Sequence, residues 1–486
     1  MKPSEIKRNI KRSLFEKLRE IKGVISVTLV GSFIDRKDLI GISDIDTIVI
    51  CKSLDKKLFD ACLNAAESID LKNCGLIDYA LKINPTFGPL KFDKPNLAII
   101  HLMIYDIDSH RKHVLASPFT CFDWERSKSV DGLKLKNIFP VGILQIRDFY
   151  EVRRSLNNYL DDLNNNVISY HKYEFDGNNV KEINKNKVLD KRHLGEYAYH
   201  IIRYLIANYL KLCTNKNDSF SNIEIKSEIT RLFPKSSYIH LKMFDTISQV
   251  KSKRANNFPK DTVQWAETFV KDFQKRITVE WSDAVPIYFL RHLKTNLNDG
   301  TYLGQGRDPN IDSTQDYDLI DESISKFYTS PLRRCVQSIF AIYKDTDIVA
   351  DDRLLEFDYG KAEGLSYNEL VNKYPRILDG WQNGEDPRFP DGENTKDVYD
   401  RLKSFLDSLA QSIKNKQSGP ICVVTHNGIL RCLIGIVFNL KLNDWHKLVI
   451  PHGIPLEFLF WRNRYNPNIP SALRSEVFQN IGCGES

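Results

Sequence analysis

The sequence predicts a multidomain α/β protein. Its 486 residues are more than one hydrophobic core usually holds, and roughly 150 residues per domain gives about three domains. Short apolar segments alternate with amphipathic ones up to about residue 140 and again from Val285, which is typical of sheets covered by helices. The intervening segment shows helical periodicity only. We therefore expect domains over residues 1–140, 141–280 and 281–486.

The composition predicts a soluble globular protein. Hydrophobic residues make up 42% and charged residues 27% of the chain, and the formal net charge is +6. That charge favours anionic ligands in general but does not by itself indicate nucleic-acid binding. The nine cysteines show no CxxC or zinc-site spacing, which predicts reduced thiols. With no signal-like start and no run of about 18 apolar residues, we expect a cytoplasmic protein without membrane contact.

In the first domain, the sequence predicts two helices and four strands. Apolar residues at three- and four-residue spacing predict helices over residues 5–21 and 55–69. Segments rich in β-branched and other apolar residues predict the strands 24–30, 45–51, 75–83 and 97–105. Gly31 and Ser32 follow the first strand, and Asp44 and Asp46 lie at the start of the second.

These four residues suit the binding of a phosphate and a metal ion. Gly31 allows the backbone to approach a phosphate closely, and the hydroxyl of Ser32 and the turn amides can donate to its oxygens. Asp44 and Asp46 are two residues apart on a strand, so both side chains point to one face, where Mg²⁺ would offset their repulsion. The alternative is that both aspartates are ordinary solvated turn residues.

The same residues resemble the motif of the DNA polymerase beta-like nucleotidyltransferase superfamily, which joins Gly-Ser to Asp-apolar-Asp-apolar by about ten residues. Here the spacer has 11 residues, and Thr47 departs from the last apolar position. The resemblance implies a mixed-sheet fold, bound Mg²⁺, and transfer of a nucleoside monophosphate from an NTP to a hydroxyl or phosphate. It also implies a third metal-binding carboxylate on a later strand, for which Asp78 is the candidate and Asp106 the reserve.

The middle domain is expected to be helical. The periodicity predicts helices over residues 143–163, 194–212 and 261–276. Residues 164–186 contain seven asparagines and are expected to form an exposed loop.

In the last domain, the alternation of short apolar segments and helical ones predicts a parallel or mostly parallel sheet with helices on both faces. Strands are expected over residues 287–290, 326–329 and 421–425, and helices over about 333–343, 366–373, 395–413 and 428–437. Each strand ends in polar residues, and in open α/β sheets ligands bind beyond the carboxyl ends of the strands.

The residue types at these strand ends suit phosphoryl transfer to a histidine. A neutral imidazole at His292 can attack phosphorus and form a phosphohistidine that water then hydrolyses. Arg291 and Arg334 offer forked guanidiniums that match phosphate oxygens. His426, at the end of another strand, can stabilise the transferring phosphoryl group. Thr295 is expected to line the same phosphate site.

Four segments in this order resemble the histidine phosphatase superfamily, also called the phosphoglycerate mutase-like family. They contain Arg291-His292, Ser330 to Ser338, Leu355 to Gly364 and Val423 to Gly428, and the resemblance covers roughly residues 285–486. It implies a three-layer α/β/α fold that needs no metal, Glu356 as general acid, and Asn298 as a phosphate contact. Leu293 replaces the family's usual glycine and Lys294 its common glutamate, which bears on the range of substrates.

Together these features predict a bifunctional enzyme. One site is expected to transfer a nucleotide from an NTP to a small sugar or polyol acceptor with Mg²⁺, and the other to hydrolyse a small phosphorylated metabolite through a phosphohistidine. Two alternatives remain open: an enzyme that processes nucleic-acid ends, and a regulatory binding protein with one inactive site. The sequence leaves the oligomeric state open.

Overall fold

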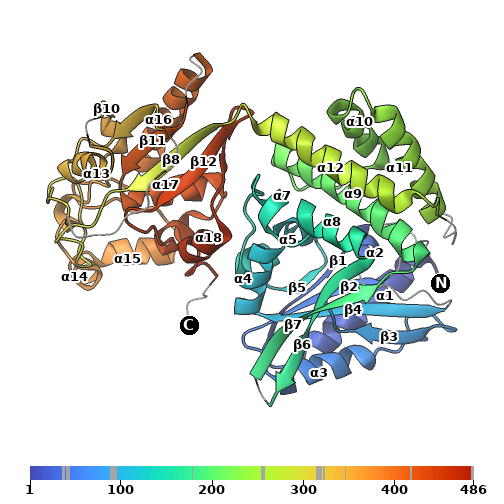
Figure 1. Ribbon diagram of the computed structural model, residues 1–486. Helices are drawn as coiled ribbons and strands as arrows, with labels where there is room; N and C mark the ends of the chain where they lie inside the picture. The colour runs from blue at the N-terminus through green and yellow to red at the C-terminus, as the bar shows by residue number, and fades with distance from the viewer. Residues whose placement is uncertain are drawn as a thin grey trace. The chain divides into compact units, whose positions relative to one another are not determined.

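The computed structural model divides into two compact units (Figure 1). The first comprises residues 1–144 and 148–278 together with Gly482, and the second comprises residues 145–147 and 279–481. The division at residue 278 lies two residues from the expected boundary, whereas the expected boundary at residue 140 falls inside the first unit, so a three-domain organisation stays a prediction. The structure describes residues 1–35, 39, 44–87, 96–177, 179–252, 258–312, 320, 323–344, 346–415 and 419–482.

The first unit contains a mixed five-stranded sheet with the strand order β3-β4-β2-β1-β5. Strand β2 pairs parallel with β4, which pairs parallel with β3, while β1 is antiparallel to both β2 and β5. The mixed sheet agrees with the expectation, and membership of the nucleotidyltransferase superfamily stays a prediction. The strands are β1 (Val24–Val30), β2 (Ile45–Cys51), β3 (Ala80–Asn84), β4 (Leu97–Asp106) and β5 (Val130–Gly132).

Helices cover this sheet and continue beyond it. Helix α1 (Pro3–Arg19) buries Ile6, Ile10, Leu14 and Leu18, which its sequence places on one face at helical spacing. None of the helices in the described part of the chain is long and apolar enough to cross a membrane. The other helices of this part are α2 (Ser32–Asp35), α3 (Lys56–Glu67), α4 (Ile107–Ala116), α5 (Pro118–Glu125), α6 (Leu135–Ile138), α7 (Asp148–Glu151), α8 (Leu156–Asn164), α9 (Lys191–Thr214), α10 (Asn222–Leu232), α11 (Ser237–Ser252) and α12 (Thr262–Trp281).

The expectation of an exposed loop over residues 164–186 is wrong. This segment forms most of an antiparallel hairpin of β6 (Val167–Asp176) and β7 (Asn179–Val188). The asparagines suggested a loop, but the chain also places Ile168, His171 and Tyr173 in the interior, and the ring of His171 stacks on Phe87 at 4.5 Å. Packing against the rest of the unit therefore overrides the weak strand propensity of asparagine.

Two expected elements are also shorter than predicted. The expected helix over 143–163 is split into α7 and α8, and between them Arg154 has a left-handed backbone with φ of 61°. The expected strand over 75–83 begins only at Ala80, because Gly75, with φ of 97°, belongs to a preceding turn.

The second unit contains a six-stranded sheet with the order β10-β9-β11-β8-β12-β13. Its first four strands are parallel, as expected, and the unpredicted β12 and β13 extend it in antiparallel fashion. The strands are β8 (Val285–Arg291), β9 (Lys326–Thr329), β10 (Ile348–Ala350), β11 (Ile421–Thr425), β12 (Pro455–Trp461) and β13 (Arg464–Pro467).

Helices lie on both faces of this sheet, as predicted. On one face, Cys335 and Ile339 of α13 (Arg333–Tyr343) form a core cluster with Phe327. On the other, Tyr328 contacts Phe405 of α16 (Thr395–Asn415) with ring centroids 5.6 Å apart. The remaining helical elements are η1 (Asp352–Leu354), η2 (Gly360–Ala362), α14 (Tyr367–Lys373), α15 (Pro375–Gln382), α17 (Asn427–Val437), η3 (Leu442–Lys447) and α18 (Ser471–Val477).

Candidate functional sites

The carboxyl ends of three parallel strands bring the predicted phosphoryl-transfer residues together in the second unit. Arg291 is the last residue of β8 and is paired with Thr425 of β11, so His292 and His426 follow neighbouring strand ends. Their rings lie 5.2 Å apart between centroids. Ser330 follows β9, and its amide donates to Val424 O at 3.0 Å. The edge expected from the sequence therefore carries both histidines.

The hydrogen bond of His292 determines which ring nitrogen can react. Its Nδ1 lies 2.6 Å from the carbonyl oxygen of Leu293, which can only accept, so Nδ1 carries the proton and Nε2 the lone pair. The side chain is 3% exposed. Burial, then the charges of Arg334 and Arg291, hold the pKa of His292 well below its usual range. His292 is therefore a neutral imidazole with its nucleophilic nitrogen defined.

Arg334 and His426 form a buried polar pair beside this nucleophile. Arg334 Nε donates to His426 Nδ1 at 3.2 Å, which leaves His426 Nε2 to donate to Ser330 Oγ at 2.8 Å. The carbonyl oxygens of Gly304 and Arg307 accept from the other two guanidinium nitrogens at 2.8 and 3.0 Å and fix its plane. Burial, then the charge of Arg334, keeps the pKa of His426 well below its usual range, so its ring is a neutral donor.

Arg291 and Glu356 add two further charged groups to this site. Arg291 Nη1 donates to Ile450 O at 2.7 Å. Burial lowers the pKa of Arg291 to about 10, partly opposed by the charge of Glu356, so the guanidinium stays charged at neutral pH. Glu356 is 4% exposed, and its Oε1 accepts from the amides of Phe357 and Gly428, each at 3.0 Å. Its role as general acid stays a prediction.

Thr295 and Asn298 lie in a turn after the nucleophile. Asn298 Oδ1 accepts from Thr295 N at 2.8 Å and from Thr295 Oγ1 at 3.2 Å. Thr295 is buried and Asn298 exposed. The turn is thus closed by the two residues themselves, and their predicted contact with a phosphate stays a prediction.

The sequence did not single out several residues that support the site. His452 donates from Nδ1 to His292 O at 2.8 Å, and its ring centroid lies 5.2 Å from that of His292. Arg401 donates to Glu356 O at 3.0 Å and pairs with Glu393 at 2.9 Å, which anchors the segment that carries Glu356. The signal for His452 lay in Pro451-His452-Gly453 just before β12, a strand that we did not predict.

We expect His292 to remain neutral in mild acid. An ordinary histidine has a pKa of about 6.5 and is mostly protonated at pH 5.5, whereas burial and two guanidiniums disfavour the imidazolium of His292. In ¹⁵N-histidine NMR spectra at pH 7.5 and 5.5, the His292 signals should keep the pattern of a neutral ring protonated at Nδ1. A midpoint near pH 6.5 would show that the ring is solvated instead.

In the first unit, the strand register brings Gly31, Asp46 and His101 together. Val30 is paired with Asp46, and Asp46 with His101 of β4. Gly31 has φ of 73°, and a Cβ there would lie 2.4 Å from Asp46 Oδ2. The Asp46 carboxylate therefore occupies the space that the side chain of any other residue at position 31 would fill. Ser32 begins α2 immediately beyond.

Asp44, Asp46 and His101 offer ligand atoms that all lie within 4.8 Å of one another. His101 Nδ1 lies 3.0 Å from Asp46 Oδ1, and its Nε2 donates to Thr86 O. Burial alone would lower the pKa of His101, but the hydrogen bond to Asp46 and the charges of Asp46 and Asp44 outweigh it, so the pKa is raised.

The structure does not bring either candidate for a third carboxylate into this group. Asp78 is exposed in the turn before β3, so its expected place on a strand is wrong. Asp106 caps α4, accepting from Ser109 N at 2.8 Å. Sequence reasoning missed His101 because it lies among apolar residues of the run 97–105, where a histidine is usually part of the core.

Replacing Gly31 by alanine should destabilise the first unit. The new Cβ would meet the Asp46 carboxylate and take up a left-handed backbone, which together should cost about 1–3 kcal/mol. Gly177 is the matched control, because it also has positive φ, at 58°, but a Cβ there meets nothing within 4 Å. In urea denaturation, Gly31→Ala should lose more stability than Gly177→Ala. Equal losses would show that Asp46 does not require the glycine.

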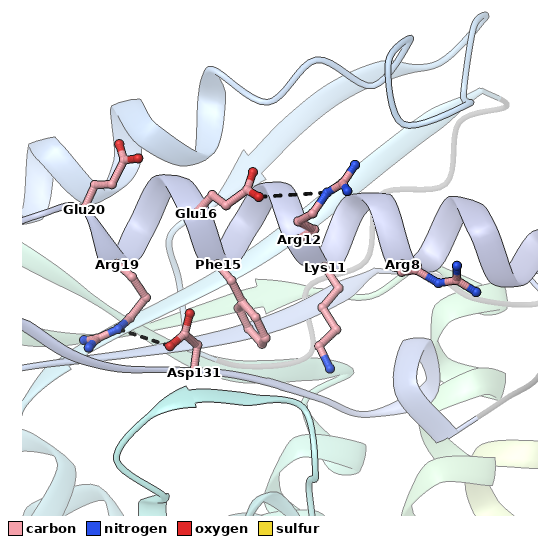
Figure 2. Close-up of a pocket in the computed structure, with 8 residues that line it drawn as sticks. All are labelled: Arg8, Lys11, Arg12, Phe15, Glu16, Arg19, Glu20 and Asp131. Carbon is pink, nitrogen blue, oxygen red and sulfur yellow. Dashed lines mark ion pairs between the residues drawn. The ribbon is translucent and has the colours of Figure 1, made fainter.

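A separate hollow of about 620 Å³ lies on the surface along α1 and contains none of the residues discussed above (Figure 2). Both basic and acidic side chains line it, and Arg19 pairs with Asp131 at 3.5 Å. Its lining residues are Arg8, Lys11, Arg12, Phe15, Glu16, Arg19, Glu20 and Asp131.

Comparison with known proteins assigns a family to part of the second unit. Residues 287–454 match the histidine phosphatase superfamily (branch 1). The chain is 28% identical over 133 residues to phosphoserine phosphatase 1 of Hydrogenobacter thermophilus, covering 26% of this chain and 61% of that protein. It is 28% identical over 166 residues to a 2,3-bisphosphoglycerate-dependent phosphoglycerate mutase of Wigglesworthia glossinidia brevipalpis, covering 27% of this chain and 70% of that protein.

A solved structure is also similar to part of the chain. The α-ribazole phosphatase of Shigella flexneri aligns with 38% of this chain and 96% of its own, at 18% identity and a TM-score of 0.34. The chain thus spans less than two thirds of phosphoserine phosphatase 1, and the family match covers its C-terminal part alone. Residues 287–454 form a histidine phosphatase domain, of the phosphatase or mutase type.

Proposed function

We propose that this chain, whose residues 287–454 are a histidine phosphatase domain, hydrolyses small phosphomonoesters through a phosphohistidine at His292. The observation that carries the proposal is the tautomer of His292, which holds its proton on Nδ1 against Leu293 O and keeps Nε2 available beside Arg334. Relatives named for phosphoserine and phosphoglycerate support a small phosphorylated metabolite as substrate.

The residues support a two-step reaction. Arg291 and Arg334 attract the phosphate, and His292 Nε2 attacks phosphorus as the bond to the leaving oxygen breaks. In the structure His426 Nε2 donates to Ser330 Oγ, and we propose that it turns this proton toward the phosphoryl oxygens as charge develops on them. Glu356, once protonated, supplies the proton that the leaving oxygen needs. Water then attacks the phosphorus of the phosphohistidine and gives a proton to the Glu356 carboxylate, the N–P bond breaks, and inorganic phosphate leaves His292 neutral again. Because guanidiniums provide the positive charge, we propose that this site needs no metal ion.

Trapping the intermediate tests this proposal. The full chain should hydrolyse p-nitrophenyl phosphate in the presence of EDTA. After a brief reaction with a ³²P-labelled phosphomonoester and denaturation in alkali, which preserves phosphohistidine, peptide mapping should place the label on His292. Label on another residue would overturn the mechanism. Absence of any turnover would favour a regulatory binding protein.

We propose a second activity for the first unit: transfer of a nucleoside monophosphate from an NTP to a small hydroxyl or phosphate acceptor, with a divalent cation. Two observations support it. Asp44 and Asp46 lie close together, and Gly31, which has no side chain, lets the Asp46 carboxylate lie against the backbone there. Two carboxylates fit a divalent cation, which the sequence suggested is Mg²⁺ and which would screen phosphate charge. The phosphatase could expose a hydroxyl that the transferase then modifies.

A screen of NTPs against free and phosphorylated polyols, read by mass spectrometry, tests this second activity. A nucleotidylated polyol is the expected product. Salt-sensitive RNA binding together with nucleotide addition to RNA ends would instead favour nucleic-acid end processing.

A further inference from the structure

We propose that His101 is the third protein ligand of a cation held by Asp44 and Asp46, and that this site prefers a first-row transition ion to Mg²⁺. The inference deepens the second proposed activity and rests on it for the role of the cation. It concerns binding, however, so it can be tested without nucleotide transfer.

The sheet itself fixes the positions of the residues. Asp46 of β2 is paired with His101 of β4, and His101 is paired with Asn84 of β3. Paired residues on neighbouring strands point to the same face, so these three side chains form a row across the sheet. Residues held by strand pairing keep their geometry better than residues on loops, which suits a metal site.

The orientation of the imidazole is that of a metal ligand. A histidine that binds a metal through one ring nitrogen usually donates the other N–H to a carbonyl or carboxylate. His101 donates from Nε2 to Thr86 O, which turns Nδ1 toward Asp46 Oδ1 at 3.0 Å. Two ligand atoms bound at about 2.1 Å and at right angles are separated by about 3.0 Å. A cation can therefore replace the hydrogen between them with little movement.

Asn84 is an independent sign that the row faces a ligand. It is 5% exposed, and among the described residues its Nδ2 has no hydrogen-bond partner. Its Oδ1 accepts from Thr86 Oγ1 at 2.8 Å, which fixes the amide. A buried donor left unsatisfied is costly. Water on the cation, or a phosphate oxygen, beside His101 would satisfy this donor.

The ligand types decide which cation is preferred. Mg²⁺ takes oxygen ligands almost exclusively, whereas imidazole favours Co²⁺, Ni²⁺ and Zn²⁺. The all-oxygen set suggested by the sequence took its third carboxylate from Asp78 or Asp106, and neither belongs to the group. With His101 in its place, the set has two carboxylates and one nitrogen.

Calorimetry and pulsed EPR on the full chain test the inference. Freed of metal, the wild-type protein should bind Co²⁺ more tightly than Mg²⁺, by a factor on the order of ten or more. Mn²⁺, used as the EPR probe, should show ¹⁴N coupling from an imidazole. His101→Asp should lose that coupling and most of the preference for Co²⁺. Asp108→Asn, an exposed acid on α4, should change neither.

Two further measurements keep the outcomes distinct. Circular dichroism confirms folding, and His101→Gln, which removes the ligand without adding a charge, should also lose the coupling. Equal affinities for Co²⁺ and Mg²⁺, or coupling that persists in folded His101→Asp, would overturn the inference, even if Mg²⁺ supports nucleotide transfer. Co²⁺ binding with ¹⁴N coupling but no NTP consumption would support the inference and refute transfer.

Discussion

Replacing His292 by alanine is expected to reduce kcat for phosphomonoester hydrolysis by on the order of 10⁴-fold or more, as for other covalent nucleophiles. The guanidiniums of Arg291 and Arg334 remain in this variant, so KM should change far less than kcat. His426 cannot substitute, because Arg334 Nε occupies its Nδ1 and its Nε2 donates to Ser330. Steady-state kinetics with p-nitrophenyl phosphate measure the effect.

The control for this variant is His446→Ala, an exposed histidine of η3 in the same unit. It should retain wild-type kinetics and phosphohistidine trapping. Circular dichroism must show that His292→Ala is folded, because the imidazole it removes is buried. A folded His292→Ala protein with activity within tenfold of the wild type would exclude His292 as the nucleophile.

The sequence predicted the second unit well because its signals are local. Apolar runs such as Ile421–Thr425 are bounded by polar residues, and a parallel sheet places the residues after each run at one edge. His292 and His426 could therefore be assigned to one site before the fold was known. Their tautomers could not, because that of His292 depends on the local backbone conformation that sets Leu293 O against Nδ1, and that of His426 depends on distant residues such as Ser330.

The first unit shows where such reasoning fails. Asp44 and Asp46 stand out in the sequence because two acids begin an apolar strand, but their third partner comes from β4 through strand pairing. The local sequence around β2 does not indicate which strand pairs with it, because that depends on the order of the strands in the folded sheet. The sequence missed the hairpin of β6 and β7 for the same reason, since its buried side chains are stabilised by distant residues such as Phe87.

Asp44→Asn is expected to abolish NTP consumption and leave phosphomonoester hydrolysis unchanged. Removing one carboxylate weakens the hold on a cation that stabilises the transition state by several kcal/mol, which corresponds to a loss on the order of 10³-fold. Asp44 is preferable to Asp46 for this purpose, because Asp46 also contacts His101 and fills the space above Gly31. The assay should be run with Mg²⁺ and with Mn²⁺, so that the result does not depend on which cation is preferred.

The reciprocal variant completes this test. His292→Ala should consume NTP at the wild-type rate, since Asp44 and His292 belong to different compact units. Asp108→Asn again serves as the exposed-acid control. If Asp44→Asn instead loses both activities while remaining folded, the two sites are not independent, and one reaction must supply a group that the other requires. If it retains NTP consumption, Asp44 holds no cation that the reaction needs, and the proposed site for nucleotide transfer is wrong.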